Sequence, residues 1–360
     1  MTRSRMNAAR AKHVAAALLL AAVGWTAARG SDWPRTPREK EASVIVPPAE
    51  RDGRASYPAF PALLPLDDAS VLVVYKEGHG HALDPGAEIV TFERDLVQGT
   101  QRALQRFAPP VPLLFQCAEP VRFANGSVAL LIDTQRIGPE PRHYRAPMRW
   151  TRSRDGGRTF GPPVVFPTVD GVGYGYPFEC HTIGGTTYLL VMTFGYLEGG
   201  RWSVDIIRTP DSGATWSLVR NLAVEFSVPG FNEGSFLPHG DGFLVASRSY
   251  DLQARLHAVD REFRLRRQLN LTEASPWVNS YIGRPRLFRH TGGVYLIGRN
   301  WTKPVAGVPQ RDAASLPRLP RAQQLCLFRI DPATLQPLSC WVLDNAEQAD
   351  VSDGYYAVVA

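Results

Sequence analysis

Short apolar segments alternate with tight turns along this chain, and the same arrangement returns five times. In each repeat, two apolar segments of strand length flank a turn built from glycine, asparagine or aspartate, which is the pattern of a β-hairpin. The clearest turns are Asn125-Gly126 and Gly184-Gly185. The five predicted hairpins cover residues 61–75, 119–133, 178–192, 233–248 and 284–299. Many short strands at a regular spacing predict an all-β protein.

A second, outer hairpin follows each inner one, and an aspartate stands at its turn. These aspartates are Asp95, Asp155, Asp211, Asp260 and Asp331. Two hairpins in each repeat give four strands, which is one blade of a β-propeller. An apolar segment at 354–360 supplies one strand of a sixth repeat. We therefore expect a six-bladed β-propeller with an incomplete last blade: either the chain is truncated at residue 360, or the ring is completed irregularly with help from a short strand at 43–46.

Two of the outer turns share the pattern Ser/Thr-x-Asp-x-Gly-x-Thr-aromatic, as SRDGGRTF at 153–160 and as TPDSGATW at 209–216. An aspartate in a turn accepts hydrogen bonds from backbone N–H groups just ahead of it, and glycine adopts positive φ without a steric penalty. We expect both turns to be rigid and structural, with the aromatic residue packed under the turn. Their defining residues are Asp155, Gly157, Asp211 and Gly213.

Ionisable residues recur at two positions of the repeat, the start of the inner strand and the end of the strand after it. In a propeller these positions converge near the central axis, so we expect one dense group of charges there, which is typical of a functional site. A solvated loop face with outward-pointing charges is the alternative. The group comprises Glu119, Glu179, Glu233, Arg284 and Tyr355 at strand starts, Lys76, Asp133, Arg248 and Arg299 at strand ends, and Glu77, His79, His81 and Asp84 in the first loop.

The two aspartate turns and their repeat resemble the Asp-box, or bacterial neuraminidase, repeats of sialidase-like propellers. The segment FNEGSFLPHGDGFLVASR is similar to the sialidase segment in which Asn-Glu starts one strand and an arginine ends the next; Glu233 and Arg248 hold those places. The segment GYYAVVA resembles the strand that carries the catalytic tyrosine. Tyr355 matches that tyrosine best, and Tyr356 is the alternative one residue further on.

The resemblance implies a retaining exo-α-sialidase that acts on glycans with a tyrosine nucleophile. A neutral phenol suits an anionic sugar, because a carboxylate nucleophile would repel the carboxylate of the substrate. The pKa of a free tyrosine is about 10, so Tyr355 needs a base, which we expect to be Glu233. Asp84 is the candidate for the acid/base that serves the leaving group. His79 and His81 are alternatives for that role, or ordinary loop residues.

Sialidases also present three arginines to the carboxylate of the sugar, because the guanidinium fork matches it. Arg248 fits one place, and Arg284 and Arg299 are candidates for another. The third arginine of the family stands two residues before a proline in the first blade, where this chain has Ala59 before Pro61. We expect further contacts with the substrate from Lys76, Glu179 and His81.

Two other functions fit the same pattern. Ala59 in place of an arginine favours a non-catalytic propeller that binds carbohydrate without turnover. A hydrolase of another sugar could instead use the axial carboxylates of Glu119, Asp133 and Glu179 as its acid and base.

Charge and cysteine content refine this picture only slightly. The net charge of +6 is spread along the chain, so we expect no nucleic-acid partner. We find no metal or haem spacing of cysteines and histidines, and expect no metal and no other cofactor. Cys326 and Cys340 flank the turn at 331–334 symmetrically and predict a cross-strand disulfide. Cys117 and Cys180 are a second candidate pair.

The N-terminus carries basic residues, then an apolar run at 14–23 that is too short to span a bilayer, then small residues at 27–28. This pattern predicts a secretory signal peptide at 1–30. We expect a secreted or periplasmic protein without membrane contact after cleavage, or a membrane-anchored one if the peptide is not cleaved. Residues 31–56 are expected to form a linker and an N-terminal strand, and residues 57–360 the propeller.

Overall fold

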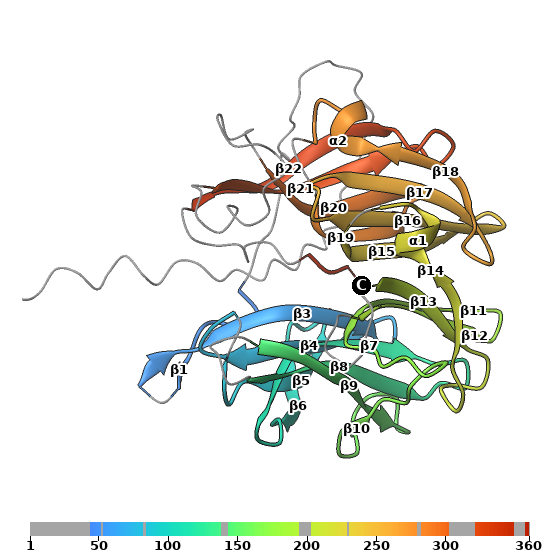
Figure 1. Cartoon of the computed structure of the whole chain (residues 1–360). Coiled ribbons are helices and arrows are strands. Elements are labelled where there is room, and N and C mark those ends of the chain that lie inside the picture. Colours follow the sequence, from blue (N-terminus) through green and yellow to red (C-terminus); the bar gives the residue numbers. More distant parts are fainter. Residues whose placement is uncertain are drawn as a thin grey trace, which may run out of the picture.

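The computed structural model describes residues 44–51, 53–81, 84–137, 143–193, 203–228, 230–278, 282–301, 321–348 and 357–359. In this part of the chain the strands form five four-stranded sheets and one small two-stranded sheet (Figure 1). Each four-stranded sheet is an antiparallel meander, in which strands lie side by side in the order of the sequence. The predicted all-β architecture and its five complete repeats are confirmed.

Each four-stranded sheet is one blade. The first two blades comprise β3 (Tyr57–Pro65), β4 (Ser70–Gly78), β5 (Glu88–Asp95) and β6 (Gln101–Phe107), and β7 (Leu113–Arg122), β8 (Val128–Ile137), β9 (His143–Ser153) and β10 (Val164–Val165). The third and fourth comprise β11 (Tyr176–Ile183), β12 (Thr186–Thr193), β13 (Ser203–Thr209) and β14 (Ser217–Asn221), and β15 (Phe231–His239), β16 (Gly242–Ser249), β17 (Ala254–Asp260) and β18 (Leu265–Asn270). The fifth comprises β19 (Gly283–His290), β20 (Gly293–Trp301), β21 (Arg321–Ile330) and β22 (Pro337–Gln348). The small sheet pairs β1 (Glu50–Arg51) with β2 (Arg54–Ala55), and the helical turns α1 (Leu222–Glu225) and α2 (Leu271–Ala274) precede the fourth and fifth blades.

The inner strands of successive blades contact one another in order, β3 with β7, β7 with β11, β11 with β15 and β15 with β19. The sheets therefore stand around a common axis with their faces packed together, which is the arrangement of a β-propeller (Figure 1). Five blades in the described residues are consistent with the six-bladed plan and its incomplete last blade.

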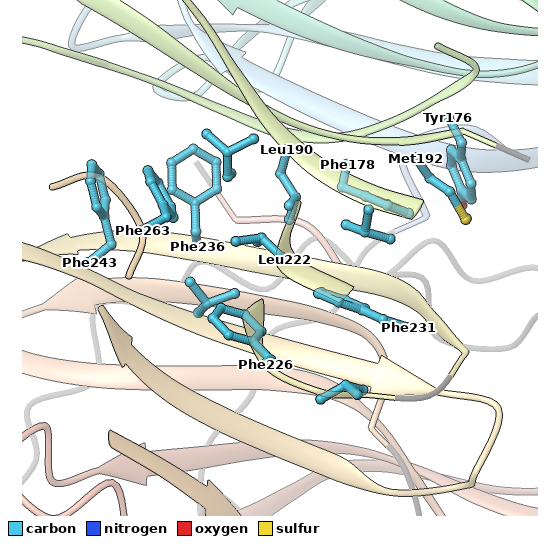
Figure 2. Close-up of a cluster of buried hydrophobic side chains, with 14 of the residues drawn as sticks. Tyr176, Phe178, Leu190, Met192, Leu222, Phe226, Phe231, Phe236, Phe243 and Phe263 are labelled. Atoms are coloured by element: carbon cyan, nitrogen blue, oxygen red, sulfur yellow. The ribbon is translucent and has the colours of Figure 1, made fainter. Parts of the chain in front are cut away.

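Hydrophobic cores lie between successive blades, because alternate residues of a strand point to opposite faces of its sheet. The core between the third and fourth blades is rich in phenylalanine (Figure 2). Phe178 and Leu190 come from the third blade, and Phe236, Phe243 and Phe263 come from the fourth. The rings of Phe243 and Phe263 stack with their centroids 4.3 Å apart. Separate clusters fill the other three spaces between blades, so the propeller is held by interfaces rather than by one central core.

Two short segments cover the outer faces of the first and fifth blades. Ile45 and Val46 pack against the face of the first blade that points away from the second blade. Ala357 and Val359 pack against the equivalent face of the fifth blade. The strand predicted at 43–46 is wrong for its described residues. They form a bend that apolar packing holds against the first blade, and they do not pair with a neighbouring strand. The two faces that have no neighbouring blade among the described residues are therefore each contacted by a short apolar segment.

Both aspartate turns have the geometry that their pattern predicts. The Oδ1 atom of Asp155 accepts hydrogen bonds from the backbone N–H groups of Arg158 and Thr159, at 3.1 and 2.9 Å. Asp211 accepts from the backbone N–H of Thr215 at 2.8 Å and from its hydroxyl at 2.6 Å. These bonds from Thr215 lower the pKa of Asp211 to about 2. The remaining turn aspartates also accept backbone N–H groups; they are Asp95, Asp260 and Asp331.

The glycine in each aspartate turn faces apolar side chains. Gly157 and Gly213 have φ values of 100° and 85°, which disfavour any residue with a β-carbon. A β-carbon on Gly213 would lie 3.1 Å from the rings of Phe123 and Trp150 in the second blade. On Gly157 it would lie 3.5 Å from Leu66, which is an ordinary contact. The second turn therefore fits more tightly against its neighbouring blade than the first.

The predicted disulfides are absent. No disulfide bond joins Cys326 to Cys340 or Cys117 to Cys180. The turn pairs Ile330 with Pro337, one residue away from the symmetric register, and a bulge in β22 adds a second residue of offset, so that Cys340 lies opposite Phe328 instead of opposite Cys326. The symmetry of the sequence around the turn therefore does not carry over to the strand pairing.

The Gly213→Ala substitution should cost more stability than Gly157→Ala. Both place a β-carbon on a residue with positive φ, but only the one at Gly213 also presses on two aromatic rings. We expect Gly213→Ala to lower the free energy of unfolding by about 2–4 kcal/mol and Gly157→Ala by about 1 kcal/mol. Urea unfolding followed by circular dichroism measures both values, and equal losses would contradict a tight contact at Gly213.

Candidate functional site

Charged side chains from four of the five blades meet near the axis. The inner strands β7, β11 and β15 each bury one glutamate, and arginines from β16, β19 and β20 lie close to them. All of these side chains except that of Arg248 are buried. We call the group the axial charge cluster; its members are Glu119, Glu179, Glu233, Arg248, Arg284, Arg286 and Arg299.

Glu233 forms the fourth-blade part of the axial charge cluster. It lies opposite Arg248 in the β15–β16 ladder, with 2.7 Å between its Oε2 atom and the Nη1 atom of Arg248. The same oxygen accepts a 2.8 Å hydrogen bond from the backbone N–H of Arg284 in the fifth blade. Burial opposes ionisation of this carboxyl, but the charges of Arg248, Arg299 and Arg284 outweigh it and lower the pKa of Glu233 to about 2. Glu233 is therefore an anion at neutral pH.

Arg286 reaches across the axis from the fifth blade to the second and third. Its Nη2 atom lies 3.0 Å from Oε2 of Glu119 on β7, and its Nη1 atom lies 3.6 Å from Oε1 of Glu179 on β11. Nη1 also donates a 2.5 Å hydrogen bond to the carbonyl oxygen of Phe178. The second and fifth blades are not neighbours in the ring, so this contact is possible only close to the axis. Sequence reasoning missed Arg286, although the Arg-Pro-Arg at 284–286 was a signal that could have found it.

Arg284 lies between two of the glutamates. Its backbone N–H binds Glu233, while its Nη2 atom is 3.7 Å from Oε2 of Glu119 and 3.4 Å from the carbonyl oxygen of Phe178. The guanidinium also lies over the ring of Tyr176, with 5.5 Å between Cζ and the ring centroid. Arg284 has a φ of 45°, a conformation uncommon for a residue with a β-carbon. The main chain of Arg284 thus binds the carboxylate of Glu233, while its side chain approaches the carboxylate of Glu119.

Burial affects the two remaining glutamates in different ways. It raises the pKa of Glu119, against the opposing charge of Arg286. For Glu179, burial is outweighed by the contacts with His181 and Arg286, and the pKa is lowered. The Nε2 atom of His181 lies 3.6 Å from Oε1 of Glu179. Because the carboxylates of Glu119 and Glu179 also repel each other, the guanidinium near both of them offsets the cost of burying the pair.

The predicted site residues of the first blade form a separate polar group. Lys76 is fully buried and donates hydrogen bonds to the carbonyl oxygens of Gly80 and His81, at 2.7 and 3.0 Å. Its Nζ atom is 3.3 Å from Oδ2 of Asp84, and that oxygen also accepts from the backbone N–H groups of His79 and Gly80. Lys76 and Asp84 therefore hold the loop after β4 from inside.

This loop is also tied to the strands beside it. The ring of His81 packs against Phe60, with 4.9 Å between the centroids, and its carbonyl oxygen accepts a 2.5 Å hydrogen bond from Gln116 on β7. Ala59, at the position where the resemblance expects an arginine, lies opposite Lys76 in the β3–β4 ladder. The cation next to that position is thus Lys76, and it is engaged by the loop.

Two other charges from the predicted group have partners elsewhere. Glu77 pairs with Arg106 on the outer strand β6. Asp133 is fully buried, and its Oδ2 atom accepts a 3.1 Å hydrogen bond from Gln135.

The predicted nucleophile Tyr355 and its alternative Tyr356 lie outside the described residues. The segment that follows them, 357–359, packs against the fifth blade, which also carries Arg284 and Arg299.

The part of the chain that the structure describes holds no group of three or more histidine, cysteine, aspartate or glutamate side chains placed to bind a metal ion. In the same residues, neither of the two short helices has the length and apolar character needed to cross a membrane.

No known protein family and no curated protein matches this chain. Solved structures do match it. A protein of unknown function from Dyadobacter fermentans superposes with a TM-score of 0.60 at 12% identity, over 84% of this chain and 86% of that one. The K499G mutant of NanB sialidase from Streptococcus pneumoniae superposes with a TM-score of 0.55 at 11% identity, over 84% of this chain and 63% of NanB. NanB in complex with 2-[(3-chlorobenzyl)ammonio]ethanesulfonate gives 0.55 at 10% identity, over 88% and 65%.

The shared feature is the propeller fold. At 10–12% identity the likeness extends to the fold and does not establish the chemistry. This chain spans less than two thirds of the length of NanB. Any activity of the axial charge cluster therefore has to be argued from its own geometry.

Glu233 should make the fold sensitive to acid. Because its folded-state pKa is lowered from 4.5 to about 2, the ionised carboxylate stabilises the protein above pH 4.5, and this contribution is lost as the pH falls toward 2. We expect Glu233→Gln to be less stable than the parent chain at neutral pH, with the difference shrinking between these pH values. Urea unfolding at a series of pH values measures it, and Glu273→Gln in α2, an exposed position, is the control. A pH-independent difference would contradict the assignment.

Arg286 should be important for stability. Removal of its guanidinium leaves Glu119 and Glu179 buried without their shared cation, so we expect Arg286→Met to lower the free energy of unfolding by about 3–5 kcal/mol. The matched control is Arg266→Met, which removes an exposed pair with Asp241 and should change stability little. Urea unfolding measures the loss of stability in both variants. Similar losses would mean that the cross-axis contacts of Arg286 contribute no more to stability than an exposed ion pair.

Proposed function

We propose that this protein acts on glycans, as an exported glycoside hydrolase of the retaining exo-α-sialidase type, and that its substrate ends in an anionic sugar. The observation that carries the proposal is that the guanidinium groups of Arg248 and Arg299 and the backbone N–H of Arg284, from two blades, converge on the single carboxylate of Glu233. Guanidinium groups have several donors in a fixed fork, so they can bind a second carboxylate, that of a sugar acid, beside the first. The name of the similar NanB, a sialidase, agrees with this substrate class.

In this proposal Tyr355 is the nucleophile and Glu233 is its base. The phenol oxygen of Tyr355 attacks the anomeric carbon, its proton moves to the carboxylate of Glu233, and the glycosidic C–O bond breaks with its electron pair on the leaving oxygen, which takes a proton from an acid. Water then attacks the anomeric carbon of the glycosyl-enzyme. A proton of this water is accepted by the conjugate base of that acid, and the bond between the anomeric carbon and the oxygen of Tyr355 breaks with its electron pair on that oxygen. The phenolate recovers its proton from Glu233 as the sugar is released.

A carboxyl group with a pKa of about 2 is a weak base in the free protein. The bound sugar changes this, because its own carboxylate shares the arginines that stabilise Glu233 and adds a like charge beside it. Both effects raise the pKa of Glu233 when the substrate is present. Binding of the anionic substrate therefore makes Glu233 a stronger base.

Asp84 is the proposed acid for the leaving group. Its Oδ2 atom is occupied by Lys76 and by two backbone N–H groups. Its Oδ1 atom makes no hydrogen bond with a described residue and is the oxygen that could carry the proton. Lys76, Glu179 and His81 are proposed to surround the sugar, with Lys76 acting through the loop that it holds.

A second function, binding of carbohydrate without turnover, is favoured by two observations. Ala59 provides no arginine at the first-blade position, and one oxygen of Asp84 is already engaged in shaping its loop. Binding to sialylated glycans on an array, together with no release of product from the same glycans, would decide for this function.

Tyr355→Phe should abolish hydrolysis of a fluorogenic sialoside, because the phenyl ring keeps the shape of the residue but cannot form the glycosyl-enzyme bond. We expect a loss of at least about a hundredfold in kcat/KM. Tyr356→Phe is the matched control and should retain activity. Full activity in Tyr355→Phe with loss in Tyr356→Phe would move the nucleophile by one residue. Full activity in both variants would exclude the tyrosine mechanism.

A further inference from the structure

Arg299 lies across a glycine. Gly283 and Arg299 face each other in the β19–β20 ladder, and both residues are buried. A β-carbon on Gly283 would lie 2.6 Å from Nε, 2.8 Å from Nη2 and 3.1 Å from Cζ of Arg299. These three atoms belong to one planar guanidinium group. The group therefore occupies the space that any side chain at position 283 would need.

The backbone of Gly283 does not itself require glycine. Its φ value is not in the left-handed region, unlike those of Gly157 and Gly213, so other residues could adopt its conformation. The three atoms nearest to the position of its β-carbon all belong to Arg299. The absence of a side chain at this position is thus explained by the guanidinium that lies over it.

Its position over Gly283 places the guanidinium of Arg299 next to Glu233. The residue after Gly283 is Arg284, and its backbone N–H donates the 2.8 Å hydrogen bond to Oε2 of Glu233. That oxygen is also the one that Arg248 binds at 2.7 Å. The charge of Arg299 is among the influences that lower the pKa of Glu233. Arg248 and Arg299 therefore act on one carboxylate from the fourth and fifth blades.

The side chain of Arg284 has a different direction. It approaches Glu119 and the carbonyl oxygen of Phe178, and its guanidinium lies over the rings of Tyr176 and Phe178. It is thus directed toward the second and third blades, away from the carboxylate of Glu233. This leaves Arg299 as the fifth-blade cation best placed to join Arg248.

We propose that Gly283 is a positioning residue whose bare α-carbon seats the guanidinium of Arg299, and that Arg299 and Arg248 together bind the carboxylate of a sugar acid beside Glu233. The inference rests on the proposed function, because it takes an anionic sugar as the ligand. It assigns to Arg299 the second guanidinium that binds the carboxylate of the sugar. The position of that guanidinium then depends on Gly283, a residue without a side chain.

The test is Gly283→Ala, with binding of N-acetylneuraminic acid measured by isothermal titration calorimetry. The three atoms nearest to the new methyl group all belong to Arg299, whose guanidinium can turn away, so the protein should still fold, and its melting temperature checks this. The affinity for the sugar acid should fall by about tenfold or more, because one charge-assisted contact is lost. Gly161→Ala is the matched control, since its β-carbon would meet only one atom, at 4.0 Å, and it should keep both values.

Arg299→Met separates positioning from a structural effect. It should weaken binding as much as Gly283→Ala does, and the double variant should be no weaker than either single variant, because both changes remove the same guanidinium. Unchanged affinity in Gly283→Ala, or additive losses in the double variant, would overturn the inference.

The outcomes also separate this inference from the proposed function. If the parent chain binds the sugar acid and Gly283→Ala weakens binding, but no sialoside is hydrolysed, the inference stands and the hydrolase does not. If the parent chain hydrolyses a sialoside and Gly283→Ala binds the sugar acid equally well, the hydrolase stands and the inference does not. A parent chain that binds no sugar acid would overturn both.

Discussion

A buried guanidinium at the axis, that of Arg286, is the interaction on which the rest of this site depends. Glutamates in the second and third blades are removed from water, and neither can remain ionised there without a nearby cation. The fifth blade provides that cation, which also binds a backbone carbonyl of the third blade. The fifth blade is thereby fixed to the second and third, which are distant from it in sequence, where the inner strands converge.

With that contact in place, the arginines next to it are constrained in direction. Arg284 uses its main chain for Glu233 and its side chain for Glu119, so it links the two ends of the axial charge cluster. Arg248 and Arg299 are then the guanidinium groups left at the Glu233 end. The same electrostatics explains both properties of Glu233: it is ionised because arginines surround it, and an anionic ligand that shares them would make it a better base.

Much of the candidate site was predictable because the repeat itself indicates which residues reach the axis. Glu119, Glu179, Glu233, Arg248 and Arg284 stand at repeat positions whose location depends only on strand order. The sequence could not indicate that Arg286 would cross the ring, because its partners come from blades remote in the chain. It also could not show that Asp84 shapes its own loop, since that depends on how Oδ2 of Asp84 meets the buried amine of Lys76 and two backbone N–H groups.

By itself, the sequence determined the hairpins, the aspartate turns and the number of complete blades, since each depends on residues close together in the chain. Tertiary structure alone decided the strand register around Cys326 and Cys340, the pairing of charges across the axis and the seat of Arg299 on Gly283. The physical reason is range. Turn chemistry and strand alternation act between near neighbours, whereas a bulge, a buried ion pair or the space left by a missing side chain has meaning only once separate blades are packed together.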